Sequence, residues 1–193
     1  MTSKKEFERH FQQHINRLNS VLSNLNLQSL FDCIEILESA RKNNKRIFFI
    51  GNGGSAATSS HFVNDLCHGT GQLSPPYNAI SLCDNSSILT ALANDYSYDD
   101  VFKLQLVNLA KKGDVLVCIS ASGNSKNIIL AVKYAKTLKM TVVGISAFDG
   151  GQLAKSSDCS ICVNTDIGDY GVSEDIHMML DHILTSFIKL YCD

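Results

Sequence analysis

The sequence has no block of basic residues and little charge of either sign. Seventeen Lys and Arg stand against nineteen Asp and Glu, which leaves a net charge of -2, and charged residues make up only 19% of the 193 positions. This balance excludes the basic surface that nucleic-acid binding requires, so no nucleic-acid partner is expected. Hydrophobic residues make up 45% of the chain, a content that excludes a disordered protein.

Long apolar runs are also missing. A helix that spans a membrane needs about 20 consecutive apolar residues, and no run here approaches that length, so no membrane partner is expected. The opening residues, Met-Thr-Ser-Lys-Lys-Glu-Phe-Glu-Arg, lack the apolar segment of a secretory signal. Together these absences predict a soluble, cytoplasmic protein.

The cysteines do not form a disulfide pattern. There are seven, an odd number, scattered through apolar segments, which is typical of reduced and buried thiols. Only Cys159 and Cys162 lie close together, in a segment that alternates like a strand. No second cysteine pair exists to complete a zinc knot, so we interpret both as core or strand residues.

Apolar residues recur at helical spacing before residue 46, and this periodicity predicts two helices there. Beyond that point, short apolar runs alternate with helical stretches. The predicted strands are 46–50, 78–82, 114–119, 141–145 and 159–163, and the predicted helices are 54–68, 86–93, 100–111, 124–138 and 174–190.

Five runs rich in Val and Ile, separated by helices, predict an α/β fold with a mostly parallel five-stranded sheet covered on both faces. The length suits one domain, 1–193, with N-terminal helices in 1–45 and an α/β core with a C-terminal helix in 46–193. Ligands are expected at the carboxyl ends of the strands.

Two loops at these strand ends are suited to hold a phosphate. The first, Gly51-Asn-Gly-Gly-Ser-Ala56, leads from a strand into a helix, where backbone N–H groups and the helix dipole attract an anion. It also fits the dinucleotide motif G-x-G-x-x-A, but no acidic residue clearly ends the second strand, and the loop lacks the lysine of a Walker motif. A tight turn that needs glycine only for steric reasons is the alternative interpretation.

The second loop, Ile119-Ser-Ala-Ser-Gly-Asn-Ser125, follows the third strand and offers three hydroxyls at a helix N-terminus. Ser120, Ser122 and Ser125, with Ser55 of the first loop, can donate hydrogen bonds to phosphate oxygens. With no obligatory Lys or Arg nearby, a phosphomonoester of a small neutral molecule fits better than a nucleoside triphosphate. Helix capping by serine is the alternative, and it does not explain both loops.

Two histidine–carboxylate pairs are candidates for chemistry. His61 and Asp65 are four residues apart and share one face of the helix after the first loop. Glu174 and His182 are eight residues apart on the last helix, about 80° around its axis. Two imidazoles and two carboxylates are normal zinc ligands, although this spacing is no strong signature. His177 and Asp181 also lie on the last helix, and isolated residues of these types are more often surface or core residues.

These residues resemble the SIS (sugar isomerase) domain family, and the whole chain resembles its phosphoheptose isomerase branch. The motifs that carry the resemblance, in the same order, are Gly51-Asn-Gly-Gly-Ser-Ala56, Ala93-Asn-Asp95, Gly113-Asp-Val-Leu116, Ile119-Ser-Ala-Ser-Gly-Asn-Ser125 and Phe148-Asp-Gly-Gly151. The resemblance implies a flavodoxin-like three-layer α/β/α fold. It also implies a homotetramer with the N-terminal helices in its interface and active sites shared between subunits.

The resemblance further implies an activity. Members of this branch convert sedoheptulose 7-phosphate to D-glycero-D-manno-heptose 7-phosphate, the first step toward activated heptose for bacterial surface polysaccharides. The implied substrate-binding residues are Asn52, Gly53, Gly54, Ser55, Asn94, Asp95, Ser120, Ser122, Ser125 and Glu174, and the implied ligands of one zinc ion are His61, Asp65, Glu174 and His182. From the residues alone, Asp95 is equally explained as a turn or helix-cap residue.

The expected reaction is an aldose–ketose isomerisation through an enediol, with Asp65 and His182 as the catalytic residues that share the proton transfers. If Asp65 is only a metal ligand, Glu174 becomes the candidate base.

The chain departs from the family pattern at several positions. Asp65 stands where the best-known members have Glu, Glu174 where they have Gln, Ala121 where Thr is common, and Cys67-His68-Gly69 where a Gly-Arg pair is usual. The added charge of Glu174 should hold a divalent cation more tightly and weaken its Lewis acidity. The alternatives are a SIS isomerase for another sugar phosphate, or a non-catalytic SIS protein that binds sugar phosphates or acts as a scaffold. The carboxylate retained at Asp65 favours an enzyme.

Overall fold

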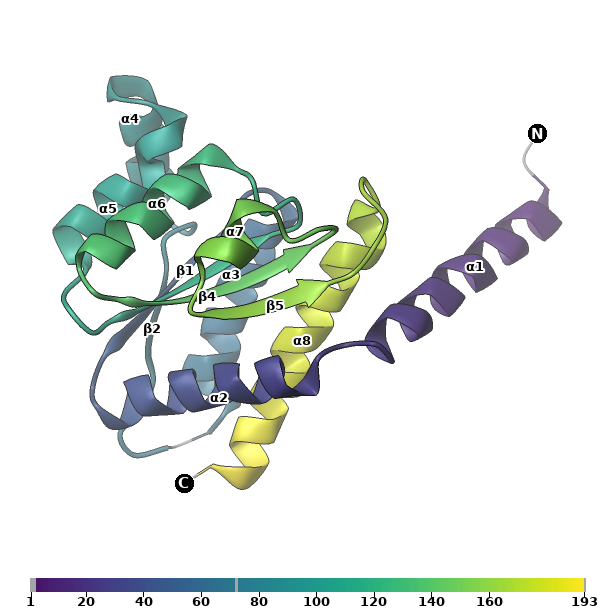
Figure 1. Cartoon of the computed structure of the whole chain (residues 1–193), viewed down its shortest axis with the longest axis horizontal. Helices are drawn as coiled ribbons and strands as arrows, with labels where there is room; N and C mark the ends of the chain where they lie inside the picture. The colour runs from purple at the N-terminus through teal and green to yellow at the C-terminus, as the bar shows by residue number, and fades with distance from the viewer. Residues whose placement is uncertain (1–2, 72, 193) are drawn as a thin grey trace.

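A computed structural model describes residues 3–71 and 73–192. The strands are β1 (Arg46–Ile50), β2 (Asn78–Ser81), β3 (Val115–Ser120), β4 (Thr141–Ala147) and β5 (Cys159–Val163), as shown in Figure 1. They form one sheet in the order β2-β1-β3-β4-β5, and every neighbouring pair is parallel. The predicted parallel sheet is confirmed, and its strand order is the flavodoxin-like one.

Helices cover both faces of this sheet (Figure 1). They are α1 (Lys4–Leu22), α2 (Leu27–Lys42), α3 (Gly54–Asn64), the π-helix η1 (Asp65–Gly69), α4 (Ser86–Asp95), the 3-10 helix η2 (Tyr98–Asp100), α5 (Val101–Leu109), α6 (Lys126–Thr137), α7 (Gly151–Ser156) and α8 (Tyr170–Tyr191). Residues of α2, α3 and α8 share the core on one face, and residues of α5 and α6 share the core on the other. The three-layer α/β/α architecture is therefore confirmed.

The central strand β1 explains why both faces must be covered. Ile47 and Phe49 lie in the core that contains α2, α3 and α8, whereas Phe48 and Ile50 lie in the core that contains α5 and α6. All four side chains are fully buried. Because successive side chains of a strand point to opposite faces, a strand that is apolar at every position requires a helical layer on each side.

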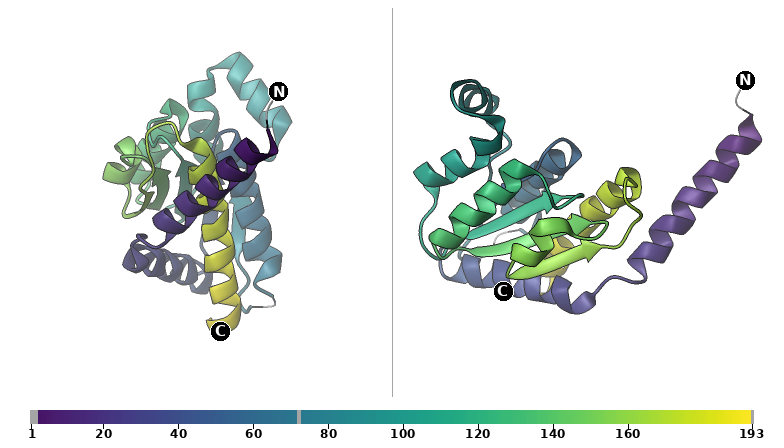
Figure 2. Two further views of the ribbon diagram at one scale, coloured as in Figure 1. Left: turned by 90° about the vertical axis from the view of Figure 1, so that its right-hand side faces the viewer. Right: turned by 45° about the horizontal axis from the view of Figure 1, so that its top comes forward.

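The first helix, α1, extends away from the rest of the chain (Figures 1 and 2). Its Phe7 and Phe11 side chains are 67% and 56% exposed. Contacts to the α8 region come from His14, whose Nε2 lies 2.8 Å from Asp175, and Arg17, which pairs with Asp169 at 2.9 Å. This exposed apolar stripe is consistent with the interface role expected for the N-terminal helices, and that role stays a prediction.

Within residues 3–71 and 73–192, no helix combines the length and apolar character needed to cross a membrane. The short helix α7 is the one described α-helix that sequence periodicity did not indicate. Its six residues cover less than two turns, too few to show a helical repeat.

The loops that follow β3 and β4 pack backbone against backbone. Gly123, in the loop after β3, has a φ of 60°, and a Cβ atom at this position would collide with the carbonyl oxygen of Gly150. The Leu153 N–H donates to the Gly123 carbonyl at 2.9 Å. Glycine supplies both the positive φ and the missing side chain that this contact requires.

We expect Gly123→Ala to lower the free energy of unfolding by about 2 kcal/mol or more, because the left-handed conformation alone costs an alanine about 1–2 kcal/mol and the Gly150 carbonyl must also move. Gly171→Ala in α8 is the matched control, since the nearest atom to its added Cβ, on His14, is 3.8 Å away. That control should be neutral or stabilising by about 0.4–1 kcal/mol. Urea denaturation measures both, and equal effects would contradict the argument.

Candidate active site

The two predicted phosphate loops meet where the strand order reverses. β1 and β3 are neighbours in the sheet, with Ile50 opposite Cys118, and each leads into one of the loops at its carboxyl end. Open parallel sheets bind ligands in the crevice at such a reversal. A cavity of about 150 Å³ at this point is lined by Asn52, Ser55, Ile119, Ser120, Ala121, Ser122, Ser125, Tyr170 and Glu174. The fold thus brings the four predicted phosphate-binding serines together.

Both loops end at helix N-termini without side-chain caps. Gly53 is the N-cap residue of α3 and has no side chain to cap it. Ser125 is the N-cap residue of α6, and its side chain makes no capping hydrogen bond. The first-turn N–H groups of a helix lack partners within the helix and carry the positive end of its dipole. The capping explanation therefore does not apply to Ser125, and both helices are suited to bind an anion.

Asn52 is held in place by two neighbours. Tyr98 donates its hydroxyl hydrogen to Asn52 Oδ1 at 2.8 Å, and Asn127 Nδ2 lies 2.9 Å from the same oxygen. Gly53 adopts a φ of 54°, a conformation that glycine reaches without steric cost. The glycine loop therefore has a defined shape before any ligand binds.

Glu174 lies at the same cavity. A Cβ atom on Gly54 would collide with the Glu174 carboxylate, so the second glycine of the pair makes room for this side chain. Glu174 and His182 are separated along α8 by eight residues, a rise of about 12 Å. Of its two expected roles, the substrate-side one is consistent with this position, and the role as a metal ligand stays a prediction.

Asn94 and Asp95 lie elsewhere. Both are exposed at the end of α4, where Asn94 Nδ2 donates to Asp95 Oδ1 at 2.9 Å, and neither lines the serine cavity. Helix α4 projects from the body of the chain (Figures 1 and 2). Their expected role in substrate binding stays a prediction.

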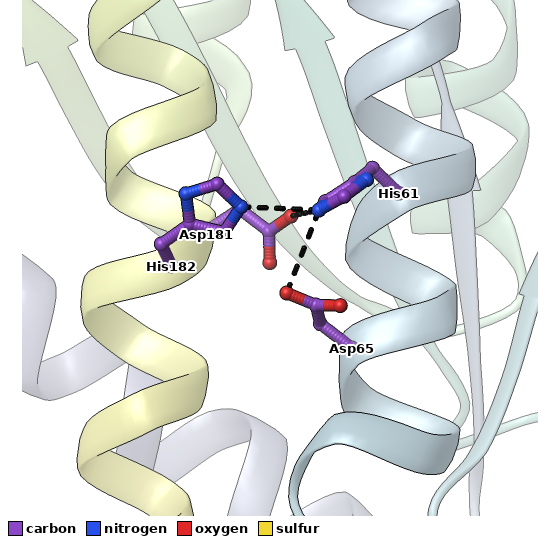
Figure 3. Close-up of side chains that lie close together, drawn as sticks. All are labelled: His61, Asp65, Asp181 and His182. Carbon is purple, nitrogen blue, oxygen red and sulfur yellow. Dashed lines mark hydrogen bonds and ion pairs between the residues drawn. The ribbon is translucent and has the colours of Figure 1, made fainter.

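A second group of side chains lies between α3, η1 and α8 (Figure 3). It contains His61, Asp65, Asp181 and His182, whose potential ligand atoms all lie within 4.8 Å of one another. His61 Nε2 is 3.0 Å from His182 Nε2, 3.6 Å from Asp65 Oδ2 and 4.0 Å from Asp181 Oδ2. Three of the four predicted metal ligands are therefore together, and Asp181 joins them.

Asp181 is fully buried, and neither of its carboxylate oxygens has a hydrogen-bond partner. Burial, and then the charge of Asp65, raise the pKa of Asp181 to about 8. Sequence patterns left Asp181 outside the candidate set, because adjacent residues on a helix point about 100° apart and the sequence does not show which helix faces them. The usable signal was a carboxylate beside His182 in an otherwise apolar stretch.

The group has the dimensions of a metal site. Ligand atoms around a tetrahedral zinc ion lie about 3.3–3.6 Å apart, given bonds of about 2.0–2.2 Å. The three separations from His61 Nε2 run from 3.0 to 4.0 Å. Two imidazoles and two carboxylates also form a normal donor set for divalent transition metals. These residues can therefore hold a metal ion.

The residues around this group also leave room beside it. A cavity of about 260 Å³ is lined by Asp65, Gly69, His182, Thr185, Ser186 and Lys189. Asp65 begins the π-helix η1, where sequence periodicity indicated a continuing α-helix, and π-helical segments frequently occur at functional sites. A larger cavity, about 680 Å³, lies between α2 and the amino ends of β3, β4 and β5 and contains none of the candidate residues.

Comparisons with known proteins agree with this geometry. A sequence model of the SIS domain matches residues 10–147. The chain belongs to the SIS domain family. It is 37% identical to a phosphoheptose isomerase from Campylobacter concisus, and the 192 aligned residues cover 98% of this chain and 92% of that relative. It is 38% identical to a probable phosphoheptose isomerase from Thermoplasma acidophilum, and the 165 aligned residues cover 86% of this chain and 90% of that relative.

Solved structures give the same result. The phosphoheptose isomerase from Neisseria gonorrhoeae superposes with a TM-score of 0.85 at 31% identity, over 97% of this chain and 98% of that one. A phosphoheptose isomerase from Francisella tularensis gives a TM-score of 0.83 at 25% identity, with the same coverage. The relatives of this SIS protein thus include phosphoheptose isomerases of nearly equal length.

His177 is a buried group of this SIS chain that lies outside both candidate clusters. Its Nε2 lies 3.2 Å from the Ser146 carbonyl oxygen, its Nδ1 has no partner, and burial lowers its pKa to about 4. An unfolded histidine has a pKa of about 6.5. The stability that His177 contributes is therefore present above pH 6.5 and is lost as the pH falls from 6.5 toward 4.

We expect His177→Gln to reduce the loss of unfolding free energy between pH 7 and pH 4.5 by about 2–3 kcal/mol, at 1.36 kcal/mol for each pKa unit. Urea denaturation at the two pH values measures this loss. His10→Gln, the same substitution on the exposed helix α1, is the control for acid sensitivity that does not come from His177. An equal acid sensitivity in wild type and His177→Gln would contradict the assignment.

Proposed function

We propose that this chain is a sugar-phosphate isomerase that converts sedoheptulose 7-phosphate to D-glycero-D-manno-heptose 7-phosphate, for activated-heptose and surface-polysaccharide synthesis. The observation that carries the proposal is the pairing of two features along one helix. Near its start, α8 borders a serine-lined cavity, and two turns later it borders the histidine–aspartate group. Relatives named phosphoheptose isomerase match the chain over almost its whole length.

The serine cavity is the proposed phosphate site. Ser55, Ser120, Ser122 and Ser125 donate hydrogen bonds to the phosphate oxygens, and the N-termini of α3 and α6 stabilise its charge. No Lys or Arg is among the described residues that line this cavity. A single phosphate ester is therefore favoured over a polyphosphate. Asn52, Gly53 and Gly54 line the path from the phosphate toward the sugar, and Glu174 supplies an acceptor for its hydroxyls.

The histidine–aspartate group is the proposed chemical centre. His61, Asp65 and His182 would hold a zinc ion, which when bound supplies polarisation of the carbonyl and hydroxyl oxygens of the sugar. Asp65 removes the proton on the carbon next to the carbonyl and returns it to the neighbouring carbon. His182 carries the proton between the two oxygens. One proton moves from a carbon to the neighbouring carbon and one moves from an oxygen to the neighbouring oxygen, so no external oxidant or reductant is needed.

The proposal includes a cytoplasmic homotetramer. Exposed apolar residues on α1, such as Phe7 and Phe11, and on α8, such as Ile183 and Phe187, support an interface between copies. In such an assembly, the exposed Asn94 and Asp95 would contribute to the active site of a neighbouring subunit. A non-catalytic scaffold would not need the histidine–aspartate group, and for that reason we favour the enzyme.

Metal-replete protein incubated with sedoheptulose 7-phosphate should form the aldose, followed by NMR, and EDTA should remove this activity. Asp65→Asn and His182→Ala should each lower kcat by about 100-fold or more, the usual contribution of a general acid or base. Asp32→Asn, on the distant helix α2, should keep wild-type turnover. Unchanged turnover in a correctly assembled His182→Ala protein would contradict the assignment of His182 as a catalytic residue. Activity only toward another sugar phosphate would support the assignment as an isomerase and contradict the assigned substrate.

Ser122→Ala should raise KM for the sugar phosphate by about 10-fold or more, because a hydrogen bond to a charged group contributes about 1.5–3 kcal/mol. Its effect on kcat should be small, since the phosphate is remote from the reacting carbons. Ser39→Ala on α2 is the control, as this exposed serine lies outside the serine cavity. Steady-state kinetics measure both variants, and an unchanged KM in Ser122→Ala would remove the serine loop from phosphate binding.

A further inference from the structure

A cluster of charged and polar side chains is buried between α2 and the segment 73–77 that precedes β2. The Arg41 side chain is 0% exposed, and it donates to the Glu38 carboxylate from Nε at 2.8 Å and from Nη2 at 2.6 Å. The Tyr77 hydroxyl donates to the same carboxylate, and the guanidinium lies 5.7 Å from the centre of the Tyr77 ring. These three residues, the Arg41 cluster, lie outside the serine cavity and the histidine–aspartate group.

The Arg41 cluster is held together by charge. Burial opposes ionisation of the Glu38 carboxyl, but the hydrogen bonds from Arg41 and Tyr77 outweigh it, so the pKa of Glu38 lies below its ordinary value. Apolar side chains in place of a buried ion pair often give equal or greater stability. Stability alone therefore does not account for this pair. A planar guanidinium does fix the direction of each group that it binds, which points to a geometric role.

The geometry that Arg41 fixes is that of the chain just before β2. Its Nη1 donates to the Pro75 carbonyl oxygen at 2.9 Å, and Tyr77, two residues later, is buried against it. The Cys67 thiol of η1 lies 3.8 Å from the carbonyl oxygens of Tyr77 and Ala79. A continuous set of contacts thus runs from α2 through Tyr77 to the π-helix η1.

The π-helix η1 in turn positions Asp65. The buried Thr70 donates from its backbone N–H to the Asp65 carbonyl oxygen at 2.9 Å and from its hydroxyl to the Leu66 carbonyl oxygen at 2.8 Å. The Asp65 side chain packs on Gly69, where an added Cβ would come within 3.4 Å of Asp65 Cβ. Because π-helical turns are rare, contacts from outside η1 are needed to hold this one in its shape.

The Arg41 cluster also borders the helix that carries His182. Cys192, the C-cap residue of α8, interacts electrostatically with both Arg41 and Tyr77. Helix α2 contacts α8, and Figure 1 shows it close to the C-terminal part of that helix. The cluster therefore lies where α2 meets both elements that carry the proposed catalytic residues.

We propose that Arg41, Glu38 and Tyr77 position the reaction centre, by holding η1 so that the Asp65 carboxylate faces the sugar. This inference rests on the proposed function for the role of Asp65. The three residues line neither the serine cavity nor the cavity beside Asp65, so they are positioning residues that act through η1. A displacement of about 1 Å at a reacting group can cost about 100-fold in rate.

Steady-state kinetics of the full-length, metal-replete protein test this role. Tyr77→Phe should lower kcat for sedoheptulose 7-phosphate by about 10-fold or more and leave KM unchanged, because the serine cavity is not altered. Tyr134→Phe, the same substitution in the core on the other face of the sheet, is the matched control and should keep wild-type turnover.

A double-mutant cycle shows whether Tyr77 acts through Asp65. In an Asp65→Asn background, Tyr77→Phe should lower kcat no further, since a residue that acts only through a carboxylate has no effect once that carboxylate is removed. An equal loss of kcat from Tyr77→Phe in both backgrounds would overturn the proposal.

Amide hydrogen exchange gives a readout independent of activity. Tyr77→Phe should speed exchange in peptides that cover 65–71 by about 10-fold or more, as the loss of a hydrogen bond to a charged group predicts. Peptides of β4 should exchange as in wild type. A residue with a purely structural role would lower Tm and leave kcat and exchange in 65–71 unchanged well below Tm. Glu38→Gln, which keeps the side-chain size and removes the ion pair, is the second variant and should give the same changes.

The remaining outcomes separate this inference from the proposed function. Wild-type kcat and wild-type exchange in Tyr77→Phe would overturn the positioning role, while turnover of sedoheptulose 7-phosphate by wild type still supports the isomerase. Faster exchange of 65–71 in a protein inert toward sugar phosphates would support the hold of the Arg41 cluster on η1 and contradict the isomerase. Loss of folded protein in both Tyr77→Phe and Glu38→Gln would assign the cluster to the core and overturn the proposal.

Discussion

The packing of α8 along α3 is the contact on which both parts of the site depend. Near the start of α8, Glu174 presses on Gly54, where any side chain would prevent the approach. Two turns later, His182 faces His61 across the same pair of helices at 3.0 Å. A shift of α8 by one residue would rotate its side chains by about 100° and separate both contacts. The buried apolar side chains of α8, including Ile176, Leu180 and Leu184, fix this register against the sheet.

The helix pair also sets the distance between two kinds of chemistry. The serine cavity lies at the carboxyl edge of the sheet, where the N-termini of α3 and α6 converge. The histidine–aspartate group lies about two turns further along α8, a rise of about 12 Å. A substrate with a phosphate at one end and a carbonyl at the other suits this separation. Glu174 lines the serine cavity and Asp181 belongs to the histidine–aspartate group, so the two carboxylates lie at different ends of this separation.

This arrangement carries a cost in stability that the fold must offset. Asp181, His177 and Ser146 are buried, and each has a polar atom without a hydrogen-bond partner. Such groups usually cost about 1–3 kcal/mol each. The sheet offsets this cost, because its central strands are buried on both faces and contribute a large apolar area. Among residues 3–71 and 73–192, three of the four buried side-chain atoms without a partner belong to α8, where the candidate chemistry also lies.

The sequence by itself determined the five strands, most of the helices and the two phosphate loops, because strand and helix periods and strand-to-helix turns are local properties of the chain. His61 and Asp65 were also paired correctly, since four residues span one helical turn. His182 beside them, and Glu174 beside the serines, were expected only from the resemblance to the SIS family, and the tertiary structure shows both placements and adds Asp181 to the group. These placements depend on which face of α8 packs on α3, and that choice is made by burial of the whole apolar surface, which no local pattern records.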